Sequence, residues 1–235
     1  MINFKEMQLN DEIHDKLDNL EIGFAFQPIY RLRDMYLIGY EALMRPKDMS
    51  PLELIDEFSR KGDLHTVELA TLFGAWQAYR ERNYDTLLSV NSFPEECMTD
   101  DEEAIFHDCF PETQTNMVLE ILEYTTLNQE KWETKQKQLK KRQVKTVLDD
   151  FGTGNNIDVD LVNIFDSVMV KLDRTLIADI DSNPNRQKVV IDYIEQFHNK
   201  GVLVLAECVE TEEELNYLKS VGVDFAQGYY LGRPA

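Results

Sequence analysis

The sequence predicts a TIM-like (β/α)8 barrel, an α/β fold, in which one strand of an opening hairpin runs antiparallel to the others. Three observations predict it: eight short apolar runs with strand character, helical patterns between most of them, and a first connection too short for a crossover. Alternating strands and helices imply parallel strands joined by right-handed crossovers. Eight strands favour closure into a barrel. An open doubly wound sheet explains the alternation nearly as well, but its G-x-G-x-x-G fingerprint is missing from the first turn.

The chain begins with a polar lead-in segment and a hairpin. Residues 1–20 carry charges of both signs with apolar positions at helical spacing, which indicates a lead-in helix, and residues 21–235 are predicted to form a single barrel domain. The segments 24–30 and 36–44 have strand composition, and their link through residues 33–35 is too short for anything except a hairpin. These two strands are therefore predicted to be antiparallel.

The rest of the chain alternates between helical and strand patterns. Further helices are predicted over 52–58, 64–82, 129–142, 157–165, 185–200 and 211–221, and further strands over 87–91, 118–122, 144–149, 168–172, 202–206 and 225–227. The helix over 185–200 has the clearest apolar face. In contrast, the segment 129–142 has little apolar content beyond Trp132 and Leu139, so we expect it on the surface with a narrow contact stripe.

Charge and cysteine content argue against several classes of protein. The 235 residues include 24 basic and 44 acidic side chains, and the net charge of −20 argues against binding a DNA or RNA polymer or an anionic membrane through a general basic surface. The three cysteines lack C-x-x-C spacing, which argues against a disulfide framework and a zinc site. No apolar run approaches the ~18 residues that a membrane span needs, so we expect a cytoplasmic protein without a membrane segment.

Polar side chains lie in or beside the carboxyl ends of seven successive predicted strands. They are Glu41 with Arg45, Asn91, Glu120 with Glu123, Asp149 with Asp150, Lys171 with Asp173, Glu207 with Glu210, and Gln227. Parallel α/β folds place their chemistry at this edge of the sheet. Each side chain alone could be a satisfied ion pair or a cap, but the whole set at one edge is more typical of a functional site.

The composition of this set indicates a site for hard metal ions. Carboxylate and amide oxygens without histidine or cysteine suit Mg²⁺ or Mn²⁺ better than zinc. Two such ions about 3.5–4 Å apart activate water and stabilise an in-line displacement at phosphorus. Asp149 is the candidate bridge between them, and Asp150 extends to the second ion. The same pair of aspartates before Phe151 and Gly152 is also typical of a turn or a helix start.

The two cationic residues of the set have two interpretations each. Lys171 is either a counter-ion to carboxylates or the group that orients or deprotonates an attacking water, a role that a pKa lowered by burial near metals would favour. Arg45, four residues after Glu41 and therefore on the same strand face, either pairs with an acidic residue or clamps a phosphate. The four histidines fall away from the strand ends and receive no role.

Eight motifs in this chain resemble, in order, those of the EAL-domain cyclic di-GMP phosphodiesterases. They are Q-P-I at 27–29, E-A-L-x-R at 41–45, V-N at 90–91, L-E-x-x-E at 119–123, D-D-F-G-x-G at 149–154, K-x-D at 171–173, A-E-C-V-E-T at 206–211, which resembles the family's A-E-G-V-E-T, and Q-G-Y at 227–229. The resemblance extends from about Gly23 to the C-terminus. The chain departs from the family pattern at Cys208, where the family usually has glycine, and after Gly154, where the family commonly has an aromatic residue and two serines but this chain continues with Asn155, Asn156, Ile157 and Asp158.

The resemblance implies a role for each residue of the set. The implied metal ligands are Glu41, Asn91, Glu120 and Asp149 for one ion, and Asp149 with Asp150 for the second. The groups implied to position and deprotonate water are Lys171 and Glu207, supported by Glu210. The residues implied to contact the bound dinucleotide are Gln27, Arg45, Asp173 and Gln227, with Arg45 on a phosphate, and Glu123 would anchor the loop after the fifth strand.

The function implied by the resemblance is hydrolysis of cyclic di-GMP to linear pGpG with two divalent cations, Mg²⁺ or Mn²⁺, in bacterial second-messenger signalling. Many members of the family dimerise through the region after D-D-F-G, so a homodimer is among the assemblies the resemblance allows. Two other functions stay open: a receptor that binds cyclic di-GMP without cleaving it, and a protein-interaction scaffold that no longer binds nucleotide. The intact charged set argues against the scaffold, because buried charges are costly without cations.

Overall fold

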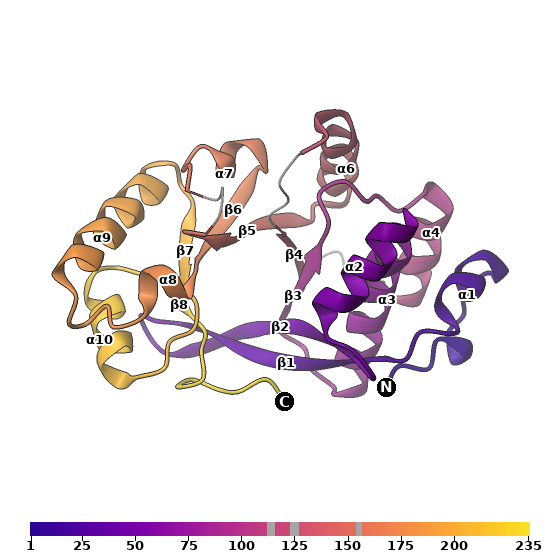
Figure 1. Cartoon of the computed structure of the whole chain (residues 1–235), viewed down its shortest axis with the longest axis horizontal. Helices are drawn as coiled ribbons and strands as arrows, with labels where there is room; N and C mark the ends of the chain where they lie inside the picture. Colours follow the sequence, from indigo (N-terminus) through magenta and orange to yellow (C-terminus); the bar gives the residue numbers. More distant parts are fainter. Residues whose placement is uncertain (112–115, 123–126, 154–156) are drawn as a thin grey trace.

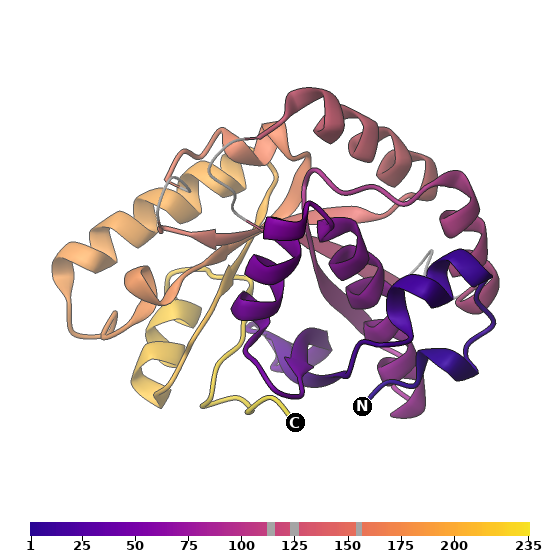
Figure 2. The same cartoon turned by 45° about the vertical axis from the view of Figure 1, so that its right-hand side comes forward.

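The strands close into a barrel that carries its helices on the outside. The computed structural model describes residues 1–111, 116–122, 127–153 and 157–235. Within these residues, eight strands follow one another around a closed barrel in sequence order. The helices between residues 11 and 109 lie on one side of it and those between residues 174 and 220 on the other (Figure 1), and Figure 2 shows the same arrangement from a second direction. The predicted α/β barrel is confirmed.

The strands begin and end within two residues of their predicted bounds. They are β1 (Ile22–Arg31), β2 (Tyr36–Pro46), β3 (Leu87–Ser92), β4 (Met117–Ile121), β5 (Lys145–Phe151), β6 (Ser167–Leu172), β7 (Leu203–Ala206) and β8 (Phe225–Ala226). β1 is antiparallel to both of its neighbours, β2 and β8. The pairings from β2 to β8 are parallel. The carboxyl ends of seven strands therefore meet at one end of the barrel, as the alternating pattern indicates.

Apart from two short elements at 4–6 and 174–177 that the sequence did not predict, the helices agree with the predicted pattern except at two places. The helical elements are η1 (Phe4–Glu6), α1 (Asp11–Leu17), α2 (Pro51–Lys61), α3 (Leu64–Glu81), α4 (Asp100–Cys109), α6 (Gln129–Arg142), α7 (Leu161–Ile164), α8 (Arg174–Ile177), α9 (Pro184–Asn199) and α10 (Glu212–Ser220). None of the helices in the described ranges is long and apolar enough to cross a bilayer.

The first of these places is α4, which the sequence reading did not identify. The Thr99 side chain accepts a hydrogen bond from the Glu102 amide, and the Glu102 carboxylate accepts one from the Thr99 amide. The T-x-x-E pattern of this capping box was the overlooked signal. The second is α7, which covers only 161–164 of the predicted helix 157–165. There the Asp158 carboxylate accepts a hydrogen bond from the Asp160 amide, a local turn that competes with helix formation.

The lead-in segment packs against the helical layer of the barrel. Phe4, Ile13 and Leu17 are buried in the same core cluster as the helices around the barrel. The Ile2 amide donates a hydrogen bond to the Ile22 carbonyl at the start of β1, at 2.7 Å. The first twenty residues therefore share their core with the rest of the molecule.

The barrel interior is built in layers. A small apolar cluster, separate from the main core, fills it: Ile29, Val147, Met169 and Leu205. Side chains alternate between the two faces of a strand, so residues two positions further on point to the same face. Asp149, Lys171 and Glu207 stand two positions after members of this cluster and are buried. An apolar floor thus supports a layer of charged side chains at the carboxyl end of the barrel.

Candidate active site

A buried lysine gathers carboxylates from four parts of the chain. Lys171 of β6 is 1% exposed. Among the described residues, four carboxylate oxygens lie within 4 Å of its Nζ atom: Asp149 Oδ1 at 2.8 Å, Glu120 Oε2 and Glu207 Oε1 at 2.9 Å, and Glu41 Oε2 at 3.5 Å. Glu41, Glu120 and Asp149 belong to β2, β4 and β5, and Glu207 follows β7 directly. Barrel closure brings these distant segments together.

The cluster holds more negative than positive charge, and this surplus shifts the pKa values of its members. Burial and the neighbouring Glu41 carboxylate raise the pKa of Glu120 well above its usual value. Burial also raises the pKa of Glu207 to about 8. It acts in the same direction on Glu41, but there the Lys171 ammonium and a hydrogen bond from Gln227 outweigh it and lower the pKa. One cation is therefore too little for the carboxylates gathered around it.

The pKa of Lys171 bears on the two interpretations that the sequence leaves open. Burial lowers the pKa of an ammonium group, and a lowered pKa would favour a role as a base. Here the surrounding carboxylates, Asp149 foremost, outweigh burial and raise the pKa of Lys171 well above its usual value. Without metal ions, the side chain is a firmly protonated counter-ion, which is the first of the two interpretations open from the sequence.

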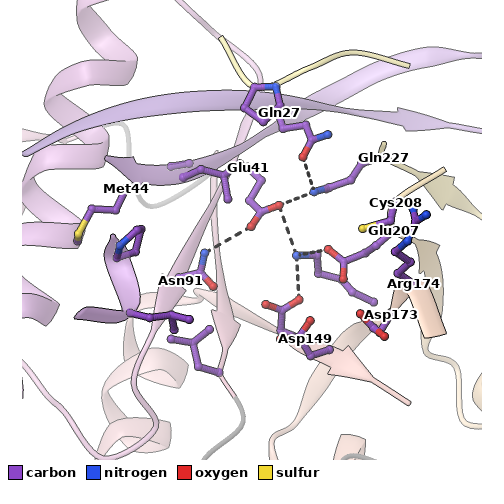
Figure 3. A pocket seen from close by; sticks show the side chains of 18 of the residues that line it. Gln27, Glu41, Met44, Asn91, Asp149, Asp173, Arg174, Glu207, Cys208 and Gln227 are labelled. Atoms are coloured by element: carbon purple, nitrogen blue, oxygen red, sulfur yellow. Dashed lines mark hydrogen bonds and ion pairs between the residues drawn. The ribbon is translucent and has the colours of Figure 1, made fainter. Parts of the chain in front are cut away.

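Amide side chains hold Glu41 at the edge of the cluster. Asn91 Nδ2 donates to Glu41 Oε1 at 3.4 Å, and Gln227 Nε2 donates to Glu41 Oε2. Figure 3 shows Glu41 between Asn91 and Gln227, with Gln27 beyond Gln227. Gln227 Nε2 also lies 3.3 Å from Gln27 Oε1, whereas Gln227 Oε1 is buried and has no hydrogen-bond partner in the described part of the chain. That oxygen is available to accept from a ligand.

Asp149 and Asp150 reach the same site because β5 is irregular at its end. Adjacent side chains of a regular strand point to opposite faces. Asp150 has a φ of 51°, and the pairing of β5 with β6 shifts register between Leu148 and Phe151. This irregularity, like a β-bulge, redirects the second carboxylate. Burial and the Asp149 charge raise the pKa of Asp150 to about 6.

The donor atoms of the cluster fit hard divalent cations. One oxygen from each of Asp149, Asp150 and Glu207 lies within 4.8 Å of the others, which is a spacing that one cation can span. These donors are carboxylate oxygens, with the amide oxygens of Asn91 and Gln227 nearby and without a histidine or cysteine ligand in the set. The surplus negative charge and the Gln227 oxygen without a partner among the described residues also favour a bound cation. The structure adds Glu207 to the carboxylates that can hold an ion.

A pocket of about 640 Å³ opens above the charged layer. Its floor is the charged layer itself, and one wall is apolar, formed by Met44, Pro51, Leu52, Ile55, Val67, Phe93 and Leu122. The wall comes from the end of β2, from α2 and α3 and from the segments after β3 and β4. A pocket with a charged floor and an apolar wall suits a ligand that combines phosphate groups with flat apolar rings.

Charged side chains also line the mouth of the pocket. Arg45 is exposed there and donates a hydrogen bond to the Met44 carbonyl at 2.9 Å, and its guanidinium forms no ion pair with a carboxylate of the described residues. Arg174 and Glu210 form an ion pair across the mouth, with Nη1 and Oε1 at 2.5 Å. Asp173 also lines the pocket and caps α8 through a hydrogen bond from the Thr175 amide. Cys208 lines the same side in the left-handed region, at a φ of 53°.

Most of the predicted site residues are brought together by the fold. Those that line the pocket are Gln27, Glu41, Arg45, Asn91, Asp149, Asp150, Lys171, Asp173, Glu207, Glu210 and Gln227. Glu120 lies behind Lys171, where Ser89 Oγ donates a hydrogen bond to it at 2.6 Å. Glu123, the predicted loop anchor, and Asn155 with Asn156, where a dimer contact was expected, lie outside the described residues.

Two residues of the site were not found from the sequence. Ser89 stands two positions before Asn91 and so shares its strand face, a signal that strand alternation offered. Arg174 follows Asp173 directly, but its partner Glu210 is 36 residues away, and no local pattern reveals that pair.

Comparison with known protein families identifies the family to which this chain belongs. A model of the EAL domain matches residues 10–234. The chain belongs to the EAL domain family. The match begins within the lead-in segment and continues to the residue before the last, so the EAL domain includes both the barrel and the charged layer.

Solved structures share the fold of this EAL domain. A standalone EAL protein from Vibrio cholerae, described in a form bound to c-di-GMP, is 24% identical, with a TM-score of 0.81 over 92% of this chain and 93% of that one. BlrP1 from Klebsiella pneumoniae, described as a manganese and cy-diGMP complex, is 25% identical, with a TM-score of 0.79 over 94% of this chain and 57% of that one.

A curated relative from Escherichia coli carries a name that states a function. It is the probable cyclic di-GMP phosphodiesterase PdeG, 24% identical over 237 residues, which are 93% of this chain and 45% of the relative. This EAL domain spans between about a third and just under half of the length of the first three curated relatives that it matches.

Proposed function

We propose that this EAL domain hydrolyses cyclic di-GMP to linear pGpG with two divalent cations, Mg²⁺ or Mn²⁺. The observation that carries the proposal is the buried Lys171 cluster, whose carboxylates outnumber its one ammonium at the floor of a pocket of about 640 Å³. Buried carboxylates in surplus are stable only with cations or protons. The names of the relative from Escherichia coli and of the two solved structures support cyclic di-GMP as the ligand.

The residues that would hold the cations are Glu41, Asn91, Glu120 and Asp149 for one and Asp149 with Asp150 for the other. Glu207 lies close enough to Asp149 and Asp150 to complete the second set. When bound, such ions polarise phosphoryl oxygens and lower the pKa of bound water. The carboxylates that raise the pKa of Lys171 would then be paired with metal, so their effect on that pKa would be weaker.

The chain's own residues would orient the reacting groups. Lys171 and Glu207, whose Nζ and Oε1 atoms are 2.9 Å apart, would hold the attacking water and take up its proton. The water oxygen forms a new bond to phosphorus while the bond from phosphorus to the ribose 3′ oxygen breaks, and that oxygen leaves with a proton. Arg45 at the mouth would bind a phosphate, and Gln27, Asp173 and Gln227 would contact the dinucleotide.

The experiment that tests this proposal measures linear product. Purified protein is incubated with cyclic di-GMP and Mg²⁺ or Mn²⁺, and pGpG is separated by chromatography. We expect turnover that is lost in Glu41→Ala and Lys171→Met. Lys61→Met serves as the matched control, because Lys61 is an exposed lysine at the end of α2.

The other outcomes identify the alternatives. Binding of cyclic di-GMP without turnover in either metal would make this EAL domain a receptor. Failure to bind the dinucleotide at all would indicate a scaffold. Turnover that persists in Lys171→Met would contradict the role given to the cluster.

A further inference from the structure

A second buried lysine lies outside the pocket, between two helices. Lys135 of α6 is 3% exposed, and Glu68 of α3 is 1% exposed. Lys135 Nζ and Glu68 Oε1 are 2.9 Å apart. Taking two charges out of water is costly, so a buried pair of this kind persists only where further hydrogen bonds satisfy both groups.

Those further hydrogen bonds all come from one short segment, residues 92–96, at and after the end of β3. Lys135 Nζ donates to Ser92 Oγ at 2.7 Å, to the Glu96 carbonyl at 2.7 Å and to the Phe93 carbonyl. Glu68 accepts from Ser92 Oγ at 2.5 Å and from the Phe93 amide at 2.9 Å. The ion pair therefore holds this segment by both its backbone and its side chain.

The same helix adds a further contact to the segment that follows. Gln138 of α6, one turn after Lys135, donates a hydrogen bond to the Met98 carbonyl at 2.8 Å. In Figure 1, α6 and α3 flank β3 and β4 on the same part of the barrel. The connection from β3 to α4 is thus attached to α6 at Phe93, Glu96 and Met98.

The segment held by the ion pair also forms part of the pocket. Asn91 and Phe93 both line the pocket, whereas Ser92 between them faces the ion pair, as strand alternation requires. Asn91 Nδ2 donates to Glu41 at the edge of the charged layer. Val67 and Thr71, on either side of Glu68 in α3, line the pocket as well. The ion pair therefore lies directly behind one wall of the site.

We propose that Glu68 and Lys135 are positioning residues for the active site, which fix Asn91 and Phe93 from behind. Within the described residues, neither Glu68 nor Lys135 lines the pocket or pairs with a member of the charged layer, and the two charges cancel each other. Its effect passes through the backbone of residues 91–93. The consequence for function rests on the proposed metal-dependent hydrolysis, because Asn91 is one of the groups that would hold a cation. Residues behind metal ligands typically change metal affinity or activity by about 10–100-fold when they are replaced.

The test compares three variants with the parent protein. Lys135→Met removes the ammonium at similar length but leaves Glu68 without its partner. Glu68→Gln with Lys135→Met removes both charges and keeps a group that can accept from the Phe93 amide, so we expect it to stay folded even if the single variant unfolds. Lys140→Met is the matched control on the same helix, since Lys140 is exposed and pairs with Asp166 at the surface.

The first measurement is binding of Mn²⁺ by electron paramagnetic resonance, which does not need turnover. We expect Mn²⁺ to bind the double variant about 10-fold more weakly than the parent protein, and Lys140→Met to bind like the parent. The second measurement is the Mn²⁺ concentration for half-maximal hydrolysis, which we expect to rise by the same factor while thermal unfolding stays above the assay temperature.

Parent-like Mn²⁺ binding in a folded double variant would overturn the positioning role. So would a loss of activity that follows only the unfolded fraction, since this is what a purely structural pair would give. If the parent protein binds Mn²⁺ but does not hydrolyse cyclic di-GMP, the proposed function fails and the binding measurement still decides the positioning role. A parent protein that binds no Mn²⁺ overturns both.

Discussion

Two lysines are buried in the described part of this EAL domain, and their surroundings are opposite in kind. Lys171 in the barrel lies among carboxylates from four separate segments of the described chain. Lys135, between α6 and α3, pairs with the single carboxylate of Glu68 and donates its other hydrogen bonds to a hydroxyl and to backbone carbonyls. Burial is nearly the same at the two sites, 1% and 3% exposed, so it is charge balance that distinguishes them.

The comparison separates a functional buried cation from a structural one. At Lys135 the charges cancel and neutral donors and acceptors complete the hydrogen bonds, so the site needs nothing from outside the chain. At Lys171 the carboxylates are in excess, and the folded chain alone leaves Glu120 and Glu207 with raised pKa values. An uncompensated surplus held in place by a rigid barrel is what a cation site requires.

The largest expected effect is on catalysis in a variant that lacks Lys171, the ammonium group among the surplus carboxylates. Lys171→Met should lower kcat for cyclic di-GMP hydrolysis by about 10²–10⁴-fold, because the group that holds the attacking water is lost. Steady-state kinetics at saturating Mn²⁺ measures this effect. A variant that keeps more than a tenth of the parent kcat would remove the functional contrast between the two lysines.

The second effect concerns the response to metal. Mn²⁺ at about 100 times its dissociation constant should raise the free energy of unfolding by about 2.7 kcal/mol, because the ions bind only the folded carboxylate cluster. Hydrogen exchange should slow in β5 and β6 and stay unchanged in α6, where the charges already cancel. Asp149→Asn should abolish the stabilisation. Equal protection of both regions would show that the ions do not act at the Lys171 cluster.

The third effect is a pH dependence of stability that we expect from a cluster around His65, outside the charged layer. His65 contacts Glu102 at 2.9 Å and Glu96 at 3.6 Å, with Lys16 also bonded to Glu102. Hydrogen bonds to Glu102 and Glu96 raise the pKa of His65 to about 9 from 6.5, so its contribution is complete below about pH 6.5 and is lost as pH rises through about 9.

The contribution of Glu102 to stability, in the same cluster, depends on pH in the opposite direction. Although burial opposes it, the His65 hydrogen bond lowers the pKa of Glu102 to about 2 from 4.5, so that contribution is present above about pH 4.5 and is lost as pH falls towards 2. His65→Gln should therefore cost about 2 kcal/mol at pH 6 and little at pH 10. Urea unfolding at the two pH values measures it, and an equal loss at both would refute the assignment.

The smallest effect lies beside the charged layer. Cys208 follows Glu207 in the left-handed region, at a φ of 53°, which costs a side chain with a Cβ about 1–2 kcal/mol. Cys208→Gly should stabilise the fold by about 0.5–1 kcal/mol after the entropy of glycine is taken into account. Met35→Gly in the β1–β2 turn, at a φ of 55°, is the matched comparison. Thermal unfolding without metal measures both, and a loss of stability in Cys208→Gly would mean that the thiol's packing outweighs the strain.

The order of the elements and the polar set at the strand ends could be predicted from the sequence. These are local properties, because alternation along a strand and the shortness of the hairpin link are readable from neighbouring residues. The helix over 129–142 is an example: its narrow stripe was predicted from Trp132 and Leu139, and both are buried. Lys135 lies between them on the same stripe. From the sequence it resembles the other surface lysines of this helix, because its partner Glu68 is distant in the chain.

The tertiary structure alone decided which charges meet. Glu120 and Lys171 are 51 residues apart, and Glu68 and Lys135 are 67 apart, so no periodicity connects them. The turn of Asp150 into the site also depends on a register shift between two strands, which single-strand alternation would have excluded. Local patterns indicate which residues stand at the ends of strands. Barrel closure sets the distances between these residues, and the pKa values and the charge surplus depend on those distances.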